Sequence, residues 1–80
     1  MSQQNQPNIE FTIDGRPFET ADHEQTAEAL LLLAGLDPSN YDLAELRGNS
    51  PQPHRYADTD EVIIHPHARF VSIRQQADVA

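Results

Sequence analysis

Apolar and polar side chains alternate near the start of the chain, as they do in a strand with one buried face. Residues 9–13 read Ile-Glu-Phe-Thr-Ile, which predicts a half-buried strand. Asp14-Gly15 follows and supplies the two positive φ angles of a type I′ turn. In the resulting hairpin Phe11 lies opposite Phe18, on the face that carries the isoleucines. Pro17 has no N–H for a ladder bond, so the second strand is expected at the edge of a sheet.

The apolar spacing then changes from that of a strand to that of a helix. One apolar stripe is formed by Ala27, Leu30, Leu31 and Ala34, and Leu33 is expected to widen it. Gly35 is the expected left-handed residue after the helix, and Pro38 prevents the helix from resuming.

Two residues are candidates for the N-cap of this helix. Asp22 and Thr26 both carry an oxygen that can accept a hydrogen bond from a free backbone N–H. Asp22 with Gln25 also has the spacing of a capping box. The sequence leaves the two alternatives open.

The second half of the chain reads as short extended segments separated by turns. A third strand is predicted at 41–46, a loop at 48–55, a turn at 58–60, a strand at 62–65 and a final strand at 69–74. The order of hairpin, helix, strand, short strand and strand is that of a β-grasp fold, which belongs to the α+β class. A right-handed crossover lays the helix across one face of a mixed sheet of four to five strands and brings the last strand beside the first.

The same pattern divides the chain into three parts and predicts its core. Residues 1–7 are expected to be disordered, residues 8–74 to form one domain, and residues 75–80 to be a flexible tail. The core is expected to contain Ile9, Phe11, Ile13, Phe18, Leu30, Leu31, Leu33, Leu43, Val62, Ile64 and Phe70.

Composition excludes several classes of function. The chain has 80 residues, no cysteine and a net charge of −8, so disulfides and thiolate metal sites are absent. An acidic surface repels phosphate backbones and attracts basic patches on proteins, so we expect protein partners and no nucleic acid. The longest apolar run, 29–34, is too short to span a bilayer. We expect a cytoplasmic monomer without a cofactor.

Two blocks of residues resemble those of the bacterial multiubiquitin-type domains. The first runs from Thr26 through the leucines to Leu36 and on to 41–43; the second comprises 60–64 and 69–71. The resemblance extends from about Ile9 to Ile73. It implies a ubiquitin-like fold. It also implies a bacterial conjugation system used in defence against phage, in which the domain is a modifier and not an enzyme.

The resemblance also implies partners and a reactive end. The partners are an adenylating protein similar to ubiquitin-activating enzymes, a protein similar to ubiquitin-conjugating enzymes, a processing or deconjugating peptidase, and the targets. The reactive group would be the carboxylate of Ala80. The tail ends Asp78-Val79-Ala80, where ubiquitin has paired glycines, and Val79 is β-branched and stiff. Either Ala80 is the mature end, made for a roomier enzyme, or the reactive end is missing; the first reading is favoured.

The last predicted strand is apolar on both faces. If Phe70 and Ser72 face the helix, Val71 and Ile73 face the other side of the sheet. Leu46 and Arg74 are added to them as a candidate partner-binding patch. The alternative is that a loop covers these side chains.

Two further features have competing explanations. His65 and His67 could share a metal ion, but no ligand set completes such a site, and surface histidines in a turn explain them better. The absence of lysine is either a compositional accident or an advantage for a protein that reacts with amines. Besides the modifier, a non-covalent adaptor that binds through its sheet remains possible; a sulfur carrier is disfavoured by the missing glycine pair.

Overall fold

A tight turn joins the first two strands of the computed structural model, which describes residues 8–75. β1 (Ile9–Ile13) and β2 (Arg16–Thr20) pair antiparallel, with Phe11 opposite Phe18. The turn residues Asp14 and Gly15 have φ angles of 54° and 81°. The predicted hairpin and its register are confirmed, and β2 lies at the sheet edge that Pro17 requires.

The described residues contain one helix, α1 (Ala27–Leu33), and Thr26 is its N-cap. The Thr26 hydroxyl accepts a hydrogen bond from the Ala29 backbone N–H at 3.1 Å. The alternative cap, Asp22, lies in a turn before the helix, where its carboxylate accepts from the Glu24 N–H. Gly35 ends the helix with a φ of 81°, as predicted.

The apolar stripe of the helix is narrower than the sequence predicts. Ala27, Leu30, Leu31 and Ala34 are all buried, but Leu33 is 48% exposed. At 100° per residue, Leu33 projects roughly 110° from the centre of the stripe, so its side chain points away from the core that the stripe contacts. The prediction that Leu33 belongs to the core is therefore wrong.

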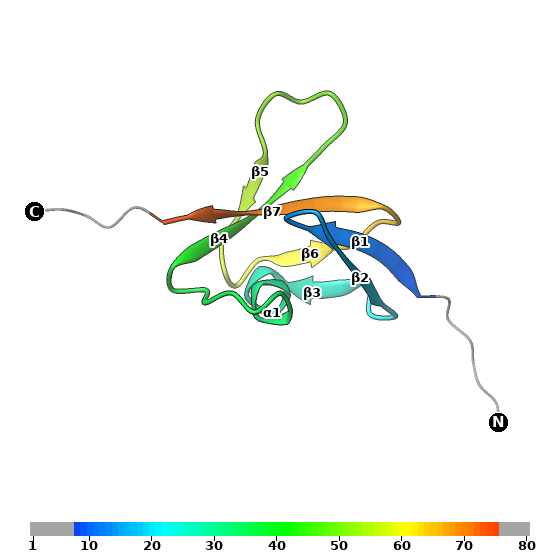
Figure 1. Cartoon of the computed structure of the whole chain (residues 1–80), viewed down its shortest axis with the longest axis horizontal. Coiled ribbons are helices and arrows are strands. Elements are labelled where there is room, and N and C mark those ends of the chain that lie inside the picture. The colour runs from blue at the N-terminus through cyan, green and yellow to red at the C-terminus, as the bar shows by residue number, and fades with distance from the viewer. Residues whose placement is uncertain (1–7, 76–80) are drawn as a thin grey trace, which may run out of the picture.

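In residues 8–75 seven strands form two sheets, and α1 lies on one side of the main sheet (Figure 1). The remaining strands are β3 (Glu24–Thr26), β4 (Tyr41–Leu46), β5 (His54–Tyr56), β6 (Glu61–Ile63) and β7 (Ala68–Arg74). The main sheet has the order β2-β1-β7-β4-β5, and β3 pairs with β6 in a second sheet of two strands. β7 runs parallel to β1 and antiparallel to β4. This mixed five-stranded sheet with one packed helix is the α+β arrangement that the sequence predicts.

Two strands of three residues were not predicted. β3 lies in the segment before the helix, and β5 begins inside the region predicted as a loop. A strand of three residues is too short to show an alternating pattern, so its partner strand decides whether it forms. β6 also ends at Ile63, before the predicted His65.

The core lies between α1 and the main sheet. Eight large side chains are almost fully buried there: Phe11, Phe70, Ile13, Leu30, Leu31, Leu43, Ile64 and Val62. Phe18 is only half-buried and packs against the margin of this cluster. Within residues 8–75 no helix is long and apolar enough to cross a membrane.

Candidate partner-binding face and tail root

The face of the main sheet away from α1 carries three of the residues predicted to bind a partner. Leu43 and Phe70 are buried beneath the helix, so the strand alternation turns the neighbouring side chains to the opposite face. The β4–β7 register then places Val71, Ile73 and Leu46 together on this open face. All three are half-buried.

Ala44 forms the floor of this open face. It pairs with Val71 on one side and Arg55 on the other, and it is fully buried although no helix covers it. The larger side chains beside it therefore shield it from water. The outcome is a continuous apolar strip across the two neighbouring strands β7 and β4.

Arg74 does not lie with the other predicted residues. It pairs with Tyr41 at the end of β7, and the alternation places it on the same side as Ser72 and Phe70. The predicted patch is thus split between two faces of the sheet. The terminal residues Asp78, Val79 and Ala80 lie outside the described residues.

Gln75 binds the domain immediately after β7. Its backbone N–H donates to the Asn40 carbonyl at 2.8 Å. Its side-chain Nε2 lies within hydrogen-bond distance of the Pro38 carbonyl, the Tyr41 carbonyl and Asp42 Oδ1, at 3.2, 3.3 and 3.0 Å. We call these contacts the tail root, because they hold the first residue of the predicted tail against the end of the segment that precedes β4 and the first two residues of β4.

A hollow of about 650 Å³ lies beside the tail root, lined by Asp42, Arg55, Ile73, Arg74 and Gln75. Asp42 and Arg55 form an ion pair across it, with an N–O distance of 3.5 Å. The hollow therefore offers charged groups of both signs and one apolar side chain. The sequence does not reveal it, because its residues come from three segments that only the sheet register brings together.

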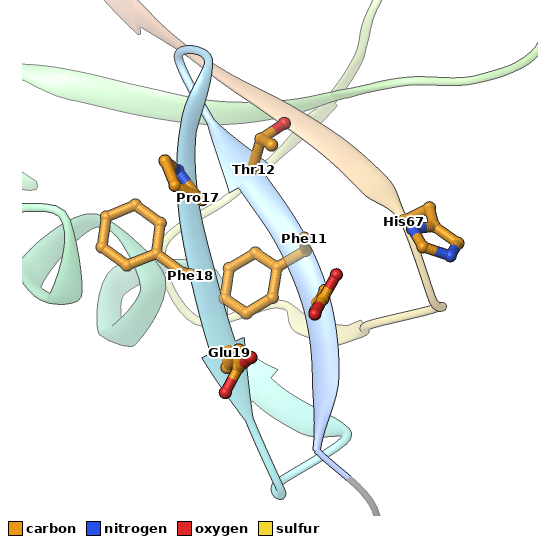
Figure 2. A pocket seen from close by; sticks show the side chains of 7 residues that line it. Phe11, Thr12, Pro17, Phe18, Glu19 and His67 are labelled. Atoms are coloured by element: carbon orange, nitrogen blue, oxygen red, sulfur yellow. The ribbon is translucent and has the colours of Figure 1, made fainter.

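A second hollow, of about 470 Å³, lies at the other end of the sheet (Figure 2). The rings of Phe11 and Phe18 line it, together with His67 and the carboxylates of Glu10 and Glu19. Phe11 is 2% exposed, so it belongs to the core more than to a surface site. None of the predicted site residues lies here.

A buried carboxylate stabilises the hairpin of β4 and β5. Glu45 is 6% exposed, and its Oε1 accepts from the Tyr56 hydroxyl at 2.7 Å and from Arg47 Nε at 3.3 Å. Burial is the main cause that raises the pKa of Tyr56, and the hydrogen bond to Glu45 raises it further. Hydrogen bonds to Tyr56 and Glu45 raise the pKa of Arg47. Each side chain of this triad is hydrogen-bonded to the other two.

The histidines provide no evidence of a metal centre. His65 and His67 are exposed on either side of Pro66. In the part of the chain that the structure describes, no group of three or more potential ligands is arranged to hold a metal ion.

The fold and the comparisons together define the class of protein. A mixed sheet with a parallel central pair and one helix across one face is the ubiquitin-like β-grasp architecture. The sequence model of the Multiubiquitin family matches residues 9–76, so the chain belongs to the multiubiquitin family. No curated protein and no solved structure matches the chain.

Proposed function

We propose that this ubiquitin-like domain is a protein modifier of a bacterial ubiquitination-like pathway, joined to its targets through its C-terminal carboxylate. The observation that carries the proposal is the position of β7. It is the central strand, paired with β1 on one side and β4 on the other, and the chain leaves it at an exposed point of the sheet (Figure 1). A terminal segment on such a rigid base can be offered to an enzyme without unfolding the domain.

The chemistry follows from the carboxylate of Ala80. One of its oxygens attacks the α-phosphorus of MgATP, so that an acyl-adenylate forms and pyrophosphate leaves. A cysteine thiolate of an enzyme then attacks the acyl carbon, and AMP leaves as the thioester forms. A target amine or hydroxyl finally displaces the thiolate and gives an amide or an ester. A peptidase would process the precursor or cleave the product.

The end of the chain sets a requirement for these enzymes. Val79 and Ala80 are bulkier and stiffer than the paired glycines of ubiquitin, and Asp78 adds a negative charge. The adenylating enzyme therefore needs a wider channel than an enzyme that receives paired glycines, and a positively charged or hydrogen-bond-donating group that binds the Asp78 carboxylate. The absence of lysine from the chain supports the proposal, because no side-chain amine competes with the target. We propose that the pathway acts in the cytoplasm and that it defends the cell against phage.

Adenylation is the direct test. The full chain and a variant lacking residues 76–80 are incubated separately with the adenylating enzyme encoded by a neighbouring gene, ATP and magnesium. We expect an acyl-adenylate on the full chain alone, measured by intact mass and by ATP–pyrophosphate exchange. If the shortened variant is turned over equally fast, the proposal is wrong.

A non-covalent adaptor is the second candidate, and the open face favours it. Val71, Ile73 and Leu46 form an apolar strip that α1 does not cover, and such strips are typical of protein-binding surfaces. Mass spectrometry of tagged protein expressed with its neighbouring genes distinguishes the candidates. A modifier yields higher-mass covalent products, whereas an adaptor yields only complexes that dissociate in denaturant.

A further inference from the structure

Gln75, an exposed residue directly after β7, makes four polar contacts with the domain. One backbone and three side-chain contacts link it to four acceptors, which lie on Pro38, Asn40, Tyr41 and Asp42. Its side-chain amide has only two hydrogens for three acceptor oxygens, so at least one hydrogen is shared between two of these oxygens. The contacts hold the chain at one place after β7 has ended.

The segment that receives Gln75 is itself held in shape. The Asp37 carboxylate accepts hydrogen bonds from the Ser39 N–H at 2.9 Å and the Ser39 hydroxyl at 2.8 Å. The N–H groups of Asn40 and Tyr41 both donate to the Asp37 carbonyl. These local hydrogen bonds do not involve Gln75, and they hold the segment that carries most of its acceptor oxygens.

The tail root and the neighbouring hollow share residues. Gln75 and its partner Asp42 both line the hollow, and Arg55 and Arg74 lie there as well. An enzyme that receives the chain beyond Gln75 would meet this charged surface at the point of entry. Gln75 and Asp42 therefore belong both to the tail root and to the surface beside it.

We propose that Gln75 is a positioning residue for the C-terminal reaction: its contacts with Pro38, Tyr41 and Asp42 orient the chain toward an enzyme docked over the hollow. The inference rests on the proposed modifier function. Releasing Gln75 frees the chain at its root, so that more conformational freedom is lost when the enzyme binds. The effect falls on binding, and KM rises while kcat changes little.

The test compares three substitutions at Gln75 in the full chain. Gln75→Ala removes the donor, Gln75→Glu keeps the shape but places a carboxylate against Asp42, and Gln75→Arg retains N–H donors without adding an amine. Gln52→Ala is the matched control, because Gln52 is an exposed glutamine in the loop after β4. Amide hydrogen exchange at residue 75 reports the contact, and ATP–pyrophosphate exchange with the adenylating enzyme reports its use.

We expect amide exchange at residue 75 to accelerate about tenfold in the alanine and glutamate variants, with a similar rise in KM. Their melting temperatures should equal that of the wild type. In the arginine variant both the exchange rate and KM should return toward the wild-type values. Equal KM values for wild type and Gln75→Ala would overturn the inference and leave the modifier function intact. A raised KM with unchanged amide exchange would overturn it too, because Gln75 would then contact the enzyme directly. If the wild type is not adenylated, the proposed function fails, and the inference fails with it.

Discussion

Asp14 and Ser72 join the first turn of the chain to its last strand. The Asp14 carboxylate accepts from the Ser72 N–H at 2.9 Å and from the Ser72 hydroxyl at 2.6 Å. The Asp14 N–H also donates to the Phe70 carbonyl at 2.9 Å. These bonds continue the parallel pairing of β1 and β7 past the end of β1, so a turn residue stabilises the centre of the sheet.

A double-mutant cycle measures this connection. Asp14→Asn keeps a residue that tolerates positive φ but weakens the bonds, and Ser72→Ala removes the hydroxyl. We expect each to lower the free energy of unfolding by about 1 kcal/mol, with the double variant losing clearly less than the sum. Urea denaturation gives these values. The control pair, Asp14→Asn with Ser50→Ala in the exposed loop, should be additive; additivity in the main cycle would show that the two residues act independently.

The start of the helix gives a second prediction. Thr26→Ala leaves the Ala29 N–H without its capping oxygen and should cost about 1 kcal/mol of stability, while Thr26→Ser should cost much less. Asp22→Ala should also cost less, because Asp22 forms an exposed turn outside the helix. Thermal unfolding followed by circular dichroism compares them. A greater loss for Asp22→Ala than for Thr26→Ala would mean that Asp22 is the cap.

Two carboxylates on the outer face of β3 and β6 make stability depend on pH. The protonated Glu24 carboxyl donates a hydrogen bond to the Glu61 carboxylate, and the charge of Glu61 repels ionised Glu24; both effects raise the pKa of Glu24 above its ordinary value. The folded state therefore binds a proton more tightly than the unfolded state does. This stabilisation is complete at low pH and is lost as the pH rises through the raised pKa, because both groups are then charged.

Removing one of these charges should reverse that loss. We expect Glu61→Gln to raise the melting temperature slightly at pH 7, and the gain over wild type to shrink as the pH falls toward 4. Glu28→Gln is the control with the same chemical change. Glu28 lies in the first turn of α1, where a negative charge is favourable, so that variant should melt at a lower temperature. A gain for Glu61→Gln that persists at low pH would exclude charge repulsion as its cause.

The open face can be tested by adding a charge to it. Val71→Asp should leave the fold intact at a cost of about 1 kcal/mol, and it should abolish complexes formed through this face. Leu33→Asp makes the same change on the helix side, where Leu33 is already exposed, and should leave them intact. Circular dichroism checks the fold, and co-purification with the products of neighbouring genes checks binding. Unfolding of the Val71 variant would show that Val71 is part of the core.

The features that sequence rules predicted correctly are those determined by residues that are close together in the chain. Asp14-Gly15 specifies a turn with two positive φ angles, and that turn alone determines that Phe11 faces Phe18. Gly35 ends the helix for an equally local reason. The open-face position of Val71 also follows from strand alternation once Phe70 is known to be buried.

Longer-range features could not be predicted in this way. β3 and β5 exist because β6 and β4 offer them ladder partners, and three residues alone carry too little pattern. The tail root depends on a register that places Gln75 beside Asn40, a residue far away in the chain.

For this protein, the sequence by itself determined the hairpin register, the helix stripe around Leu30 and Leu31, and the order of elements that defines a β-grasp fold. These follow from backbone geometry and from apolar periodicity, both of which act over one or two turns of chain. Only the tertiary structure decided that Asp42 meets Arg55 in an ion pair and that Gln75 is held at the tail root. Those relationships need strands that are distant in the chain to pair first, because only their pairing brings the groups within hydrogen-bond distance.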